Sequence, residues 1–516
     1  MRNLGKALRL GLFLASIGGQ ALAQDVTLTS RDGGVQLSGQ LLTYDGEFYR
    51  IDTEFGELTL DGSGVQCTGP GCPELSAYVA RLSVAGAALA VDRLLPALMT
   101  SFARVQGYDL DMQGAGDQIV FQLSEGDQLV AAFEAASSSD DTALASLIGG
   151  QVNMAFSSRE VLPAEIALGQ EAGVGNLAAP AQNRAIALDA VVPVLSARNR
   201  ISEVSLDELA DVFSGKIDNW SALGGADALI SLHLVAGDTI ARRMLLEKVL
   251  LAADVQLSAQ ITYHDDAKAL AAAVVRDPFA LGLTTLSERG GTKPVGLKGG
   301  CGFRVGADGA ALKSEDYPLT APLFVYVTDA RLPKIGREFL RFVRTPAAQV
   351  AILQAGLVDQ GFGRTAIARQ GERLANAIRN AGGDVGLADL RELVTEMEQR
   401  ARLSVTFRFK EGAAELDGQS RSNVLLLARA LETGALRAEE LTFMGFSDTV
   451  GEAAENKRLS LERALAVRRA VLEAAVTFSP GQMRIRAKGL GEALPMACDD
   501  TFWGRQVNRR VEVWVR

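Results

Sequence analysis

Three polar residues near the end of the chain have types and spacing that suit recognition of a zwitterion. Asp448 lies in a Gly-bounded loop, and Asn456 and Arg463 follow it in a segment, 452–475, with helical spacing. At about 100° per residue, Asn456 and Arg463 lie within about 20° of each other. We expect both to face outward, because an apolar stripe on the other side would dock the helix. The stripe consists of Leu461, Ala464, Leu465, Val471 and Leu472. A carboxylate, an amide and a guanidinium that converge there could hold a group with both an amine and a carboxylate.

Three ordered motifs resemble the OmpA-like peptidoglycan-binding domain over about residues 402–516. They are Gly445–Gly451 (GFSDTVG), Asn456–Ala464 (NKRLSLERA) and Asn508–Val511 (NRRV). The resemblance implies an α+β domain of βαβαβ type. It also implies that Asp448 binds the ammonium of a diaminopimelate stem peptide, and that the forked guanidinium of Arg463 binds its carboxylate.

In the same resemblance Asn456, Asn508 and Arg509 complete the peptidoglycan pocket. The chain departs from the family at Phe446, where His is usual, and at Ser447, where Thr is usual. Both residues flank the acid, so we expect altered affinity with the charge pairing kept. The alternative is an ordinary surface helix with solvated charges.

A second region, from about residue 80, alternates strands with helices. Leu82–Gly86, Ile119–Leu123 and Val152–Phe156 read as strands, and a helical pattern follows each of the first two. This order predicts an α/β sheet with its loops gathered at the carboxyl ends of the strands. Helix N-termini at such loops favour an anion.

This region resembles the phosphate-binding proteins of ABC transporters over about residues 80–360. The specific run is Phe213–Gly225 (FSGKIDNWSALGG), with weaker support from Asp189, Asp277–Gly282 and Tyr317–Thr320. The resemblance implies two α/β lobes, joined by crossover strands, that close around phosphate or another small oxyanion. It also implies an ABC permease as a partner, with other envelope proteins as alternatives.

The ligand loops match that family less well than the fold does. The first strand-to-helix turn, Gly86–Leu89, offers backbone N–H groups in place of the family's hydroxyls. Each missing donor to a buried oxyanion costs on the order of 1–3 kcal/mol. The alternative is therefore a degenerate cleft that serves as a protein-docking surface in an envelope scaffold. The candidate ligand-binding residues are Ala87, Ala88, Ser124, Ser157, Ser158, Arg159, Asp238, Thr239 and Arg242.

The N-terminus predicts export. Arg2, Lys6 and Arg9 precede the apolar run Leu10–Ile17, and Ala21–Ala23 supplies small residues for cleavage before Gln24. No later segment is apolar for long enough to span a bilayer, and no Cys directly follows the cleavage site to carry a lipid anchor. We expect a location in the periplasm of a Gram-negative bacterium, at the cell wall or outer membrane.

Charge and composition exclude several functions. Removing residues 1–23 changes the net charge from −10 to −13, because three basic residues leave and no acidic ones do. An acidic chain without basic runs argues against nucleic acid and anionic membrane surfaces. The two histidines, His233 and His264, have no metal-ligand spacing, and no nucleophile lies beside a recognisable base. We therefore expect no metal, no cofactor and no enzyme; a wall-localised hydrolase is the alternative.

Four cysteines in an exported protein favour disulfides. Cys67 and Cys72 bracket a Thr-Gly-Pro-Gly turn and are expected to pair. Cys301 and Cys498 lie in different predicted domains, and either bond or remain as two buried thiols.

The predicted organisation is a signal peptide (1–23), a small β module closed by a disulfide (24–78), an α/β two-lobed domain (79–362), a helical linker (363–401) and the α+β domain (402–516). In the linker, helical spacing breaks at Gly382-Gly383 and resumes at Leu387. This pattern predicts a helical hairpin or spacer rather than a disordered tether.

Overall fold

The computed structural model describes residues 25–75, 77–115, 117–299, 301–410, 415–479, 481, 483–499 and 502–516. The predicted signal peptide lies outside these residues. The chain forms two compact units. The first comprises the described residues up to Ala80 together with Leu332–Ile335, and the second comprises Arg81–Arg331 and Gly336–Arg516.

The first unit is the predicted β module. Its strands are β1 (Val26–Ser30), β2 (Gln36–Tyr44), β3 (Phe48–Thr53), β4 (Gly56–Asp61) and β5 (Val65–Thr68). They form an antiparallel sheet in the order β4-β3-β2-β1-β5 around a small core of Val26, Leu28, Tyr49 and Ile51. Alternating apolar residues place one side of each strand in this core.

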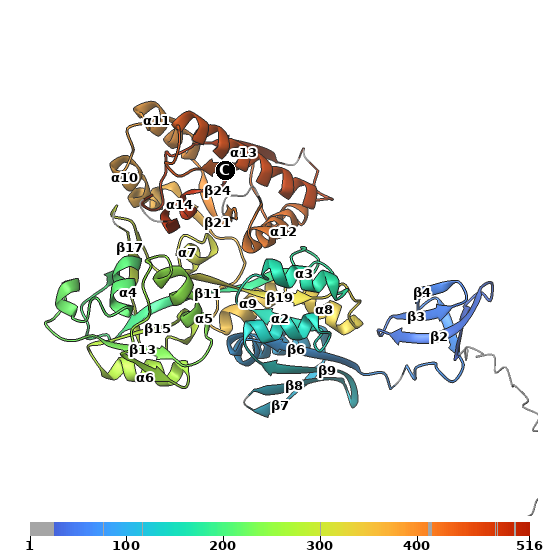
Figure 1. Ribbon diagram of the computed structural model, residues 1–516. Coiled ribbons are helices and arrows are strands. Elements are labelled where there is room, and N and C mark those ends of the chain that lie inside the picture. Colours follow the sequence, from blue (N-terminus) through green and yellow to red (C-terminus); the bar gives the residue numbers. More distant parts are fainter. Residues whose placement is uncertain are drawn as a thin grey trace, which may run out of the picture. The chain divides into compact units, whose positions relative to one another are not determined.

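The second unit begins with a two-lobed α/β domain built on one curled sheet. The strand path is β14-β13-β15-β11-β19-β10-β6-β9-β8-β7. The long strands β11 (Asn183–Leu195) and β19 (Thr320–Val327) pair antiparallel and pass from one lobe to the other (Figure 1). This crossover pair confirms the predicted two-lobed architecture.

The first lobe contains β6 (Ala80–Gly86), β7 (Asp109–Ala115), β8 (Gln118–Glu125), β9 (Gln128–Ser137) and β10 (Met154–Ser157). Its helices are η1 (Leu89–Leu94), α1 (Leu95–Gln106), α2 (Asp140–Ile148), α3 (Pro163–Glu171), α8 (Lys334–Phe342) and α9 (Pro346–Gln354). A buried cluster that includes Leu144, Leu147, Phe324 and Tyr326 fixes α2 against β10 and β19.

The second lobe contains β13 (Ser231–Val235), β14 (Ile261–His264) and β15 (Ala280–Thr285). Its helices include α4 (Leu206–Phe213), η2 (Trp220–Leu223), α5 (Ile240–Met244), η3 (Leu245–Leu250), α6 (Ala267–Arg276) and α7 (Gly309–Lys313). The remaining short elements are β12 (Glu203–Val204), η4 (Leu286–Glu288), β16 (Lys293–Pro294), β17 (Gly296–Lys298) and β18 (Arg304–Val305).

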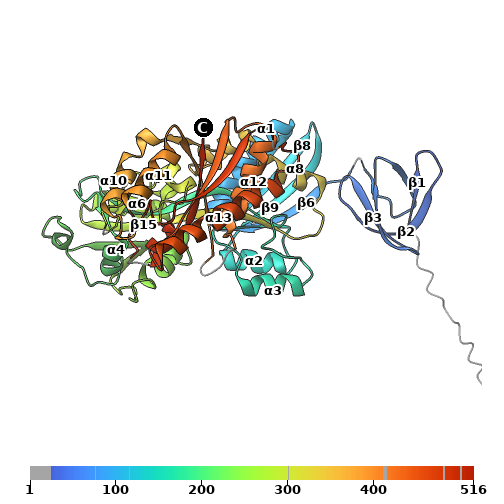
Figure 2. The ribbon, with the colours of Figure 1, turned by 90° about the horizontal axis from the view of Figure 1, so that it is seen from above.

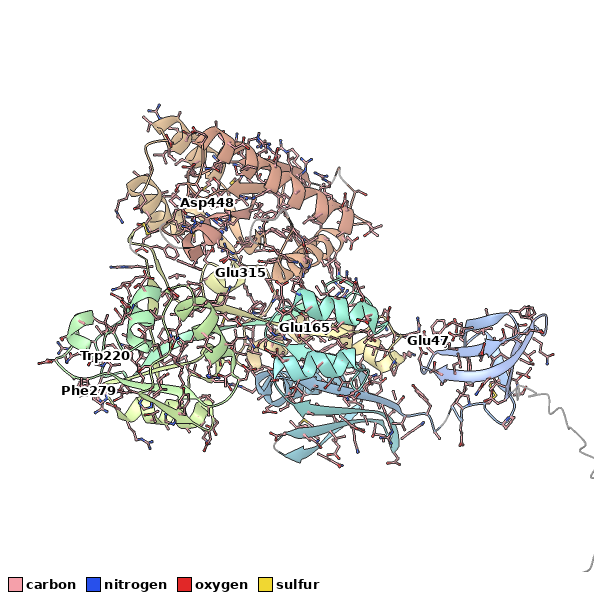
Figure 3. The ribbon with its side chains drawn as sticks, in the orientation of Figure 1. Glu47, Glu165, Trp220, Phe279, Glu315 and Asp448 are labelled. Atoms are coloured by element: carbon pink, nitrogen blue, oxygen red, sulfur yellow. A yellow bond between two sulfur atoms is a disulfide. The ribbon has the colours of Figure 1, made fainter. Side chains whose placement is uncertain are left out.

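The Phe213–Gly225 run has a packing role in this lobe. Trp220 is buried, and its Nε1 donates to the Phe279 carbonyl at 2.9 Å (Figure 3). Asn219 caps η2 by accepting from the Ser221 backbone N–H at 2.9 Å. The run therefore stabilises the lobe.

The C-terminal domain is a five-stranded sheet in the order β20-β21-β24-β22-β23. The strands are β20 (Arg364–Ala366), β21 (Ala401–Arg408), β22 (Glu440–Phe446), β23 (Arg484–Gly489) and β24 (Arg510–Val515). The helices α12 (Gly418–Glu432) and α13 (Ala453–Ala474) pack side by side (Figure 2). They share a core with Leu441, Phe443, Val511 and Val513, on one face of the sheet.

The predicted linker is part of this domain. β20 pairs with β21, and the short helix η5 (Ile367–Arg369) leads into α10 (Gly371–Arg379) and α11 (Leu387–Met397). Ala377, Leu393 and Met397 pack with Phe446 and Trp514 from the opposite face of the sheet. These residues form helices, and the apolar faces of the helices complete a core of the C-terminal domain.

Candidate functional site

The predicted peptidoglycan pocket brings Asp448, Arg463 and Arg509 together. Asp448 follows β22 and is 7% exposed, and its Oδ2 accepts from Arg509 Nη1 at 2.6 Å (Figure 3). Arg463, half-buried on α13, has no hydrogen-bond or ion-pair partner among the described residues, and its Cζ lies 5.6 Å from the centre of the Phe409 ring. Burial and then the charge of Arg509 lower the pKa of Arg463, whereas Asp448 opposes the shift. Asp448 therefore pairs with Arg509 alone, and the neighbouring guanidinium of Arg463 has no carboxylate partner among the described residues.

The two asparagines differ from the prediction. Asn456 was expected to face outward, but it is buried with Ser460, Ala464, Val467 and Val471. These residues form the buried face of α13, which is turned about the helix axis relative to the predicted apolar face. Asn456 Nδ2 donates to the Val450 carbonyl at 3.1 Å and to Glu492 Oε1 at 2.7 Å, which holds the Asp448 loop on the helix.

Asn508 is also a positioning residue. Its side chain is buried and makes hydrogen bonds to the backbone of Met496 and Ala497 and to Asp499 Oδ1, at 2.6 to 3.2 Å. With its amide and carbonyl groups both satisfied by the protein, Asn508 orders the 496–499 segment. Its predicted contact with a ligand is therefore not supported by the geometry.

The two departures from the family motif lie beneath the site. Phe446 is fully buried, with the Arg510 guanidinium 4.4 Å from its ring centre. The Ser447 hydroxyl is buried without a hydrogen-bond partner among the described residues. Both side chains are buried, so neither is placed to contact a ligand directly.

A cavity of about 500 Å³ lies between the two lobes of the α/β domain. The strands β6, β9, β10, β13, β14 and β15 reach it at their carboxyl ends, and Asp117 reaches it from the connection between β7 and β8. The first lobe contributes Ala87 and Ala88 after β6, the run Ser137–Asp140 after β9, and Ser158 after β10. The second lobe contributes Asp238 and Thr239 after β13, Asp265 and Asp266 after β14, and Thr284, Thr285 and Glu288 at the end of β15 and in η4.

Arg243 joins the two lobes across this cavity. Its Nη1 lies 2.5 Å from Asp140 Oδ2, and its Nη2 donates to Ser158 Oγ at 2.6 Å. Asp140 also accepts from the Ser158 backbone N–H at 2.9 Å and from the Ser158 hydroxyl at 2.5 Å. We call Arg243, Asp140 and Ser158 the interlobe latch.

Of the predicted cleft residues, Ala87, Ala88, Ser158, Asp238 and Thr239 line the cavity, and four others do not. The arginine that lines the cavity is Arg243, the neighbour of the predicted Arg242. Its side chain reaches Asp140 across the cavity. Arg159 is occupied by Glu165, at 2.7 and 2.9 Å, and by Asp141. Ser157 donates to the Arg159 carbonyl at 3.0 Å, and Ser124 lies on β8, where it pairs with Asp109 in the ladder.

The sequence prediction missed the run Ser137–Asp140 and the acidic residues Asp265, Asp266 and Glu288. The signal for the first was available, since serines followed by Asp140 and Asp141 are typical of a helix N-terminus after a strand. Ser139 caps α2 by accepting from the Thr142 backbone N–H at 3.1 Å.

The expected Cys67–Cys72 disulfide is confirmed, and of the two alternatives for Cys301 and Cys498 the structure has the bonded one. Cys67 and Cys72 are bonded, with Cα atoms 5.8 Å apart. Cys301 and Cys498 are bonded across 197 residues of sequence and link the second lobe to the C-terminal domain. His233 and His264 contact each other, with Nδ1 and Nε2 2.8 Å apart. Within the described residues, no group of three or more His, Cys, Asp or Glu side chains is arranged to hold a metal ion.

Comparisons with known proteins identify both domains. Residues 125–346 match the PBP superfamily domain, and residues 408–509 match the OmpA family. The chain therefore contains a domain of binding-protein type and an OmpA-family domain, as the resemblances predicted. These are non-enzymatic kinds of domain.

Individual relatives match parts of the chain. The probable lipoprotein YiaD of Escherichia coli is 41% identical over 70 residues, which is 14% of this chain and 30% of that protein. Outer membrane porin F of Pseudomonas aeruginosa is 33% identical over 116 residues, 22% of this chain and 31% of the porin. This chain thus spans less than a third of the length of either relative.

Among solved structures, an ABC-type phosphate transport receptor from Vibrio cholerae matches with a TM-score of 0.41 and 13% identity. The match covers 54% of this chain and 99% of that receptor. No helix in the described part of the chain has the length and apolar character that crossing a bilayer requires.

Proposed function

We propose that this protein is a periplasmic solute-binding protein that its C-terminal domain holds non-covalently on peptidoglycan. The observation that carries the proposal is the Arg463 guanidinium, which has no protein partner among the described residues and lies beside the Asp448–Arg509 pair. These residues occupy the positions of the family's binding motif.

The proposed contact uses opposite charges. The ammonium of a diaminopimelate stem peptide binds the Asp448 carboxylate, and its carboxylate binds Arg463, with Arg509 as a second donor. A hydrogen bond to a charged group contributes about 1.5–3 kcal/mol. Loss of either charge therefore removes much of the affinity of a small ligand.

Sedimentation with purified peptidoglycan sacculi tests this proposal. We expect Asp448→Ala and Arg463→Ala each to abolish sedimentation while circular dichroism stays unchanged. Arg469→Ala is the matched control, because Arg469 is an exposed arginine on the same helix. Sedimentation of both pocket variants at the level of the control would contradict the assignment.

The cavity between the lobes is the proposed solute site. Phosphate or a related oxyanion is the ligand that the sequence resemblance implies, and it remains a prediction. A receptor fixed to the wall is poorly suited to shuttle solute to an ABC permease. We therefore propose that it captures or senses its solute near the wall.

The second candidate function is an envelope scaffold whose cleft binds no solute. The interlobe latch favours it, because Arg243 and Asp140 already join the lobes through protein contacts alone. Calorimetry and thermal shift with phosphate, sulfate and a basic solute distinguish the two. An absence of heat and of any shift with every probe supports the scaffold.

A further inference from the structure

The walls of the interlobe cavity carry an excess of negative charge. Five carboxylates line it without an ion pair to any described residue. They are Asp117, Asp238, Asp265, Asp266 and Glu288. Like charges held around one cavity disfavour an anion and favour a cation, because the field of each carboxylate adds to the others.

The positive groups of the cavity are already in use. Arg243 is the arginine of the lining, and the latch contacts occupy two of its nitrogens. The helix N-termini are capped by the chain itself: Thr239 accepts from the Arg242 backbone N–H at 3.2 Å, and Asp266 accepts from that of Ala269 at 2.7 Å. Few guanidinium and backbone N–H groups of the cavity are therefore left to bind an oxyanion.

A separate observation points to a ligand with donors. Thr284 lines the cavity at the end of β15 and is only 2% exposed, yet its hydroxyl has no hydrogen-bond partner among the described residues. A polar side chain on a residue this buried is normally hydrogen-bonded. Nearby, Glu288 Oε2 is held by the Thr285 hydroxyl at 2.8 Å, which orients a second acceptor.

From these observations we propose that the cavity binds a small organic cation that carries one or more ammonium groups. The inference rests on the proposed solute-binding function and names the chemical class of the solute. In the described residues the carboxylates do not form a metal-binding group, so an ammonium compound fits better than a metal ion. Leu89, Val235 and Ile240 give the cavity apolar wall for methylene groups, and its volume is within the range of small-molecule sites.

Isothermal titration calorimetry of the mature chain tests the proposal, with spermidine as the probe. We expect saturable binding of spermidine. Asp238→Asn/Asp265→Asn, at two exposed carboxylates from different loops, should weaken it by about tenfold or more. Thr284→Val should weaken it while circular dichroism stays unchanged. Glu171→Gln, an exposed acid outside the cavity, is the matched control and should bind as the wild type does.

Several results would overturn the proposal. These are no heat with spermidine, equal affinity in the double variant and the control, or complete displacement of spermidine by an equal charge of Mg²⁺. Binding of inorganic phosphate, lost in Arg243→Gln, would also overturn it, but would leave the solute-binding function standing. Sacculus sedimentation is measured on the same variants, so a failure of wall anchoring is recorded separately.

Discussion

At the scale of single residues, Asp189 shows how burial affects a carboxylate between the lobes. It is 1% exposed on β11, and it accepts from the Ser287 hydroxyl at 2.5 Å and the Ala190 backbone N–H at 2.7 Å. Burial raises its pKa to about 6, although these hydrogen bonds oppose the shift. The folded protein therefore holds the proton of Asp189 more tightly than the unfolded chain does. Its contribution to stability is complete below the unfolded pKa and is lost as the pH rises to about 6.

We predict that Asp189→Asn removes this pH dependence. Relative to the variant, the wild type should lose about 3 kcal/mol of unfolding free energy between acidic pH and pH above the folded pKa. Urea denaturation across this interval measures the difference. Parallel curves for the wild type and the variant would show that Asp189 does not titrate as proposed. Glu171→Gln is the control, because this exposed carboxylate should leave the curve parallel to that of the wild type.

The residues of the candidate sites were easier to predict from the sequence than the directions in which their side chains point. Motif spacing located Asp448, Arg463 and Arg509, which the structure brings together. It placed Asn456 on the wrong side of its helix and chose Arg242 in place of Arg243. The helix period is fixed, but the phase depends on which side is covered, and a single sequence does not contain that information.

At the scale of elements, β22 and α13 approach each other backbone to backbone. A Cβ added at Gly445 would lie 1.9 Å from the Ser460 carbonyl oxygen, and one at Gly489 would lie 2.6 Å from the Lys457 carbonyl oxygen. Two glycines on neighbouring strands thus let the helix that carries Arg463 lie directly on the sheet. This close contact fixes Arg463 relative to the Asp448 loop.

We predict that Gly445→Ala destabilises the protein by about 1–3 kcal/mol or more, because backbone atoms must move. It should also weaken sacculus binding, since α13 and the Asp448 loop are displaced. Gly383→Ala is the control, because an added Cβ there meets no atom within 4 Å. Thermal denaturation and sedimentation measure the two effects. Equal melting temperatures in both variants would contradict the close contact.

Element types followed from local pattern, but their neighbours did not. The expected helix 452–475 corresponds to α13, Ala453–Ala474. Spacing likewise predicted helices before residue 401, yet it could not show that α10 and α11 cover the sheet face of Phe446 and Trp514. Apolar periodicity predicts that one face of a helix is buried, but it does not show which other element packs against that face.

At the scale of the second compact unit, the C-terminal domain contacts both lobes. Arg421 Nη2 lies 3.1 Å from Glu160 Oε2, and Ser422 Oγ accepts from the Ala185 backbone N–H at 2.9 Å, both in the first lobe. The Cys301–Cys498 disulfide joins it to the second. These partners are far apart in sequence, so composition and motifs did not predict the contacts. The exception is the Cys301–Cys498 bond, which the sequence offered as one of two alternatives. The contacts join the C-terminal domain and both lobes into one connected body.

A buried ion network forms the centre of this connection. Arg402 donates to both oxygens of Asp316, at 2.5 and 3.0 Å, and its Nε lies 3.3 Å from Glu512 Oε2. Arg373 Nη2 and Arg510 Nε donate to Glu512 Oε1 at 2.5 and 2.8 Å. Burial lowers the pKa of Arg510 to about 9, whereas Glu512 opposes the shift. Glu315, next to Asp316, lies partly buried between the domains (Figure 3), and desolvation and then the charge of Asp417 raise its pKa.

The network predicts that the connection between the domains depends on Asp316. Burial alone would raise the pKa of Asp316, but Arg402 outweighs it and holds the pKa below its usual value. The stabilising charge pair is therefore present at neutral pH and is lost as the pH falls through the folded pKa.

Asp316→Asn leaves a buried guanidinium without its main partner, which costs about 3–5 kcal/mol. Calorimetry should show a lower melting temperature for this variant. Glu455→Gln is the control, because it breaks the exposed ion pair with Arg458 on α13 and should leave the melting temperature unchanged. Equal melting temperatures for the two variants would mean that the buried pair does not stabilise the connection.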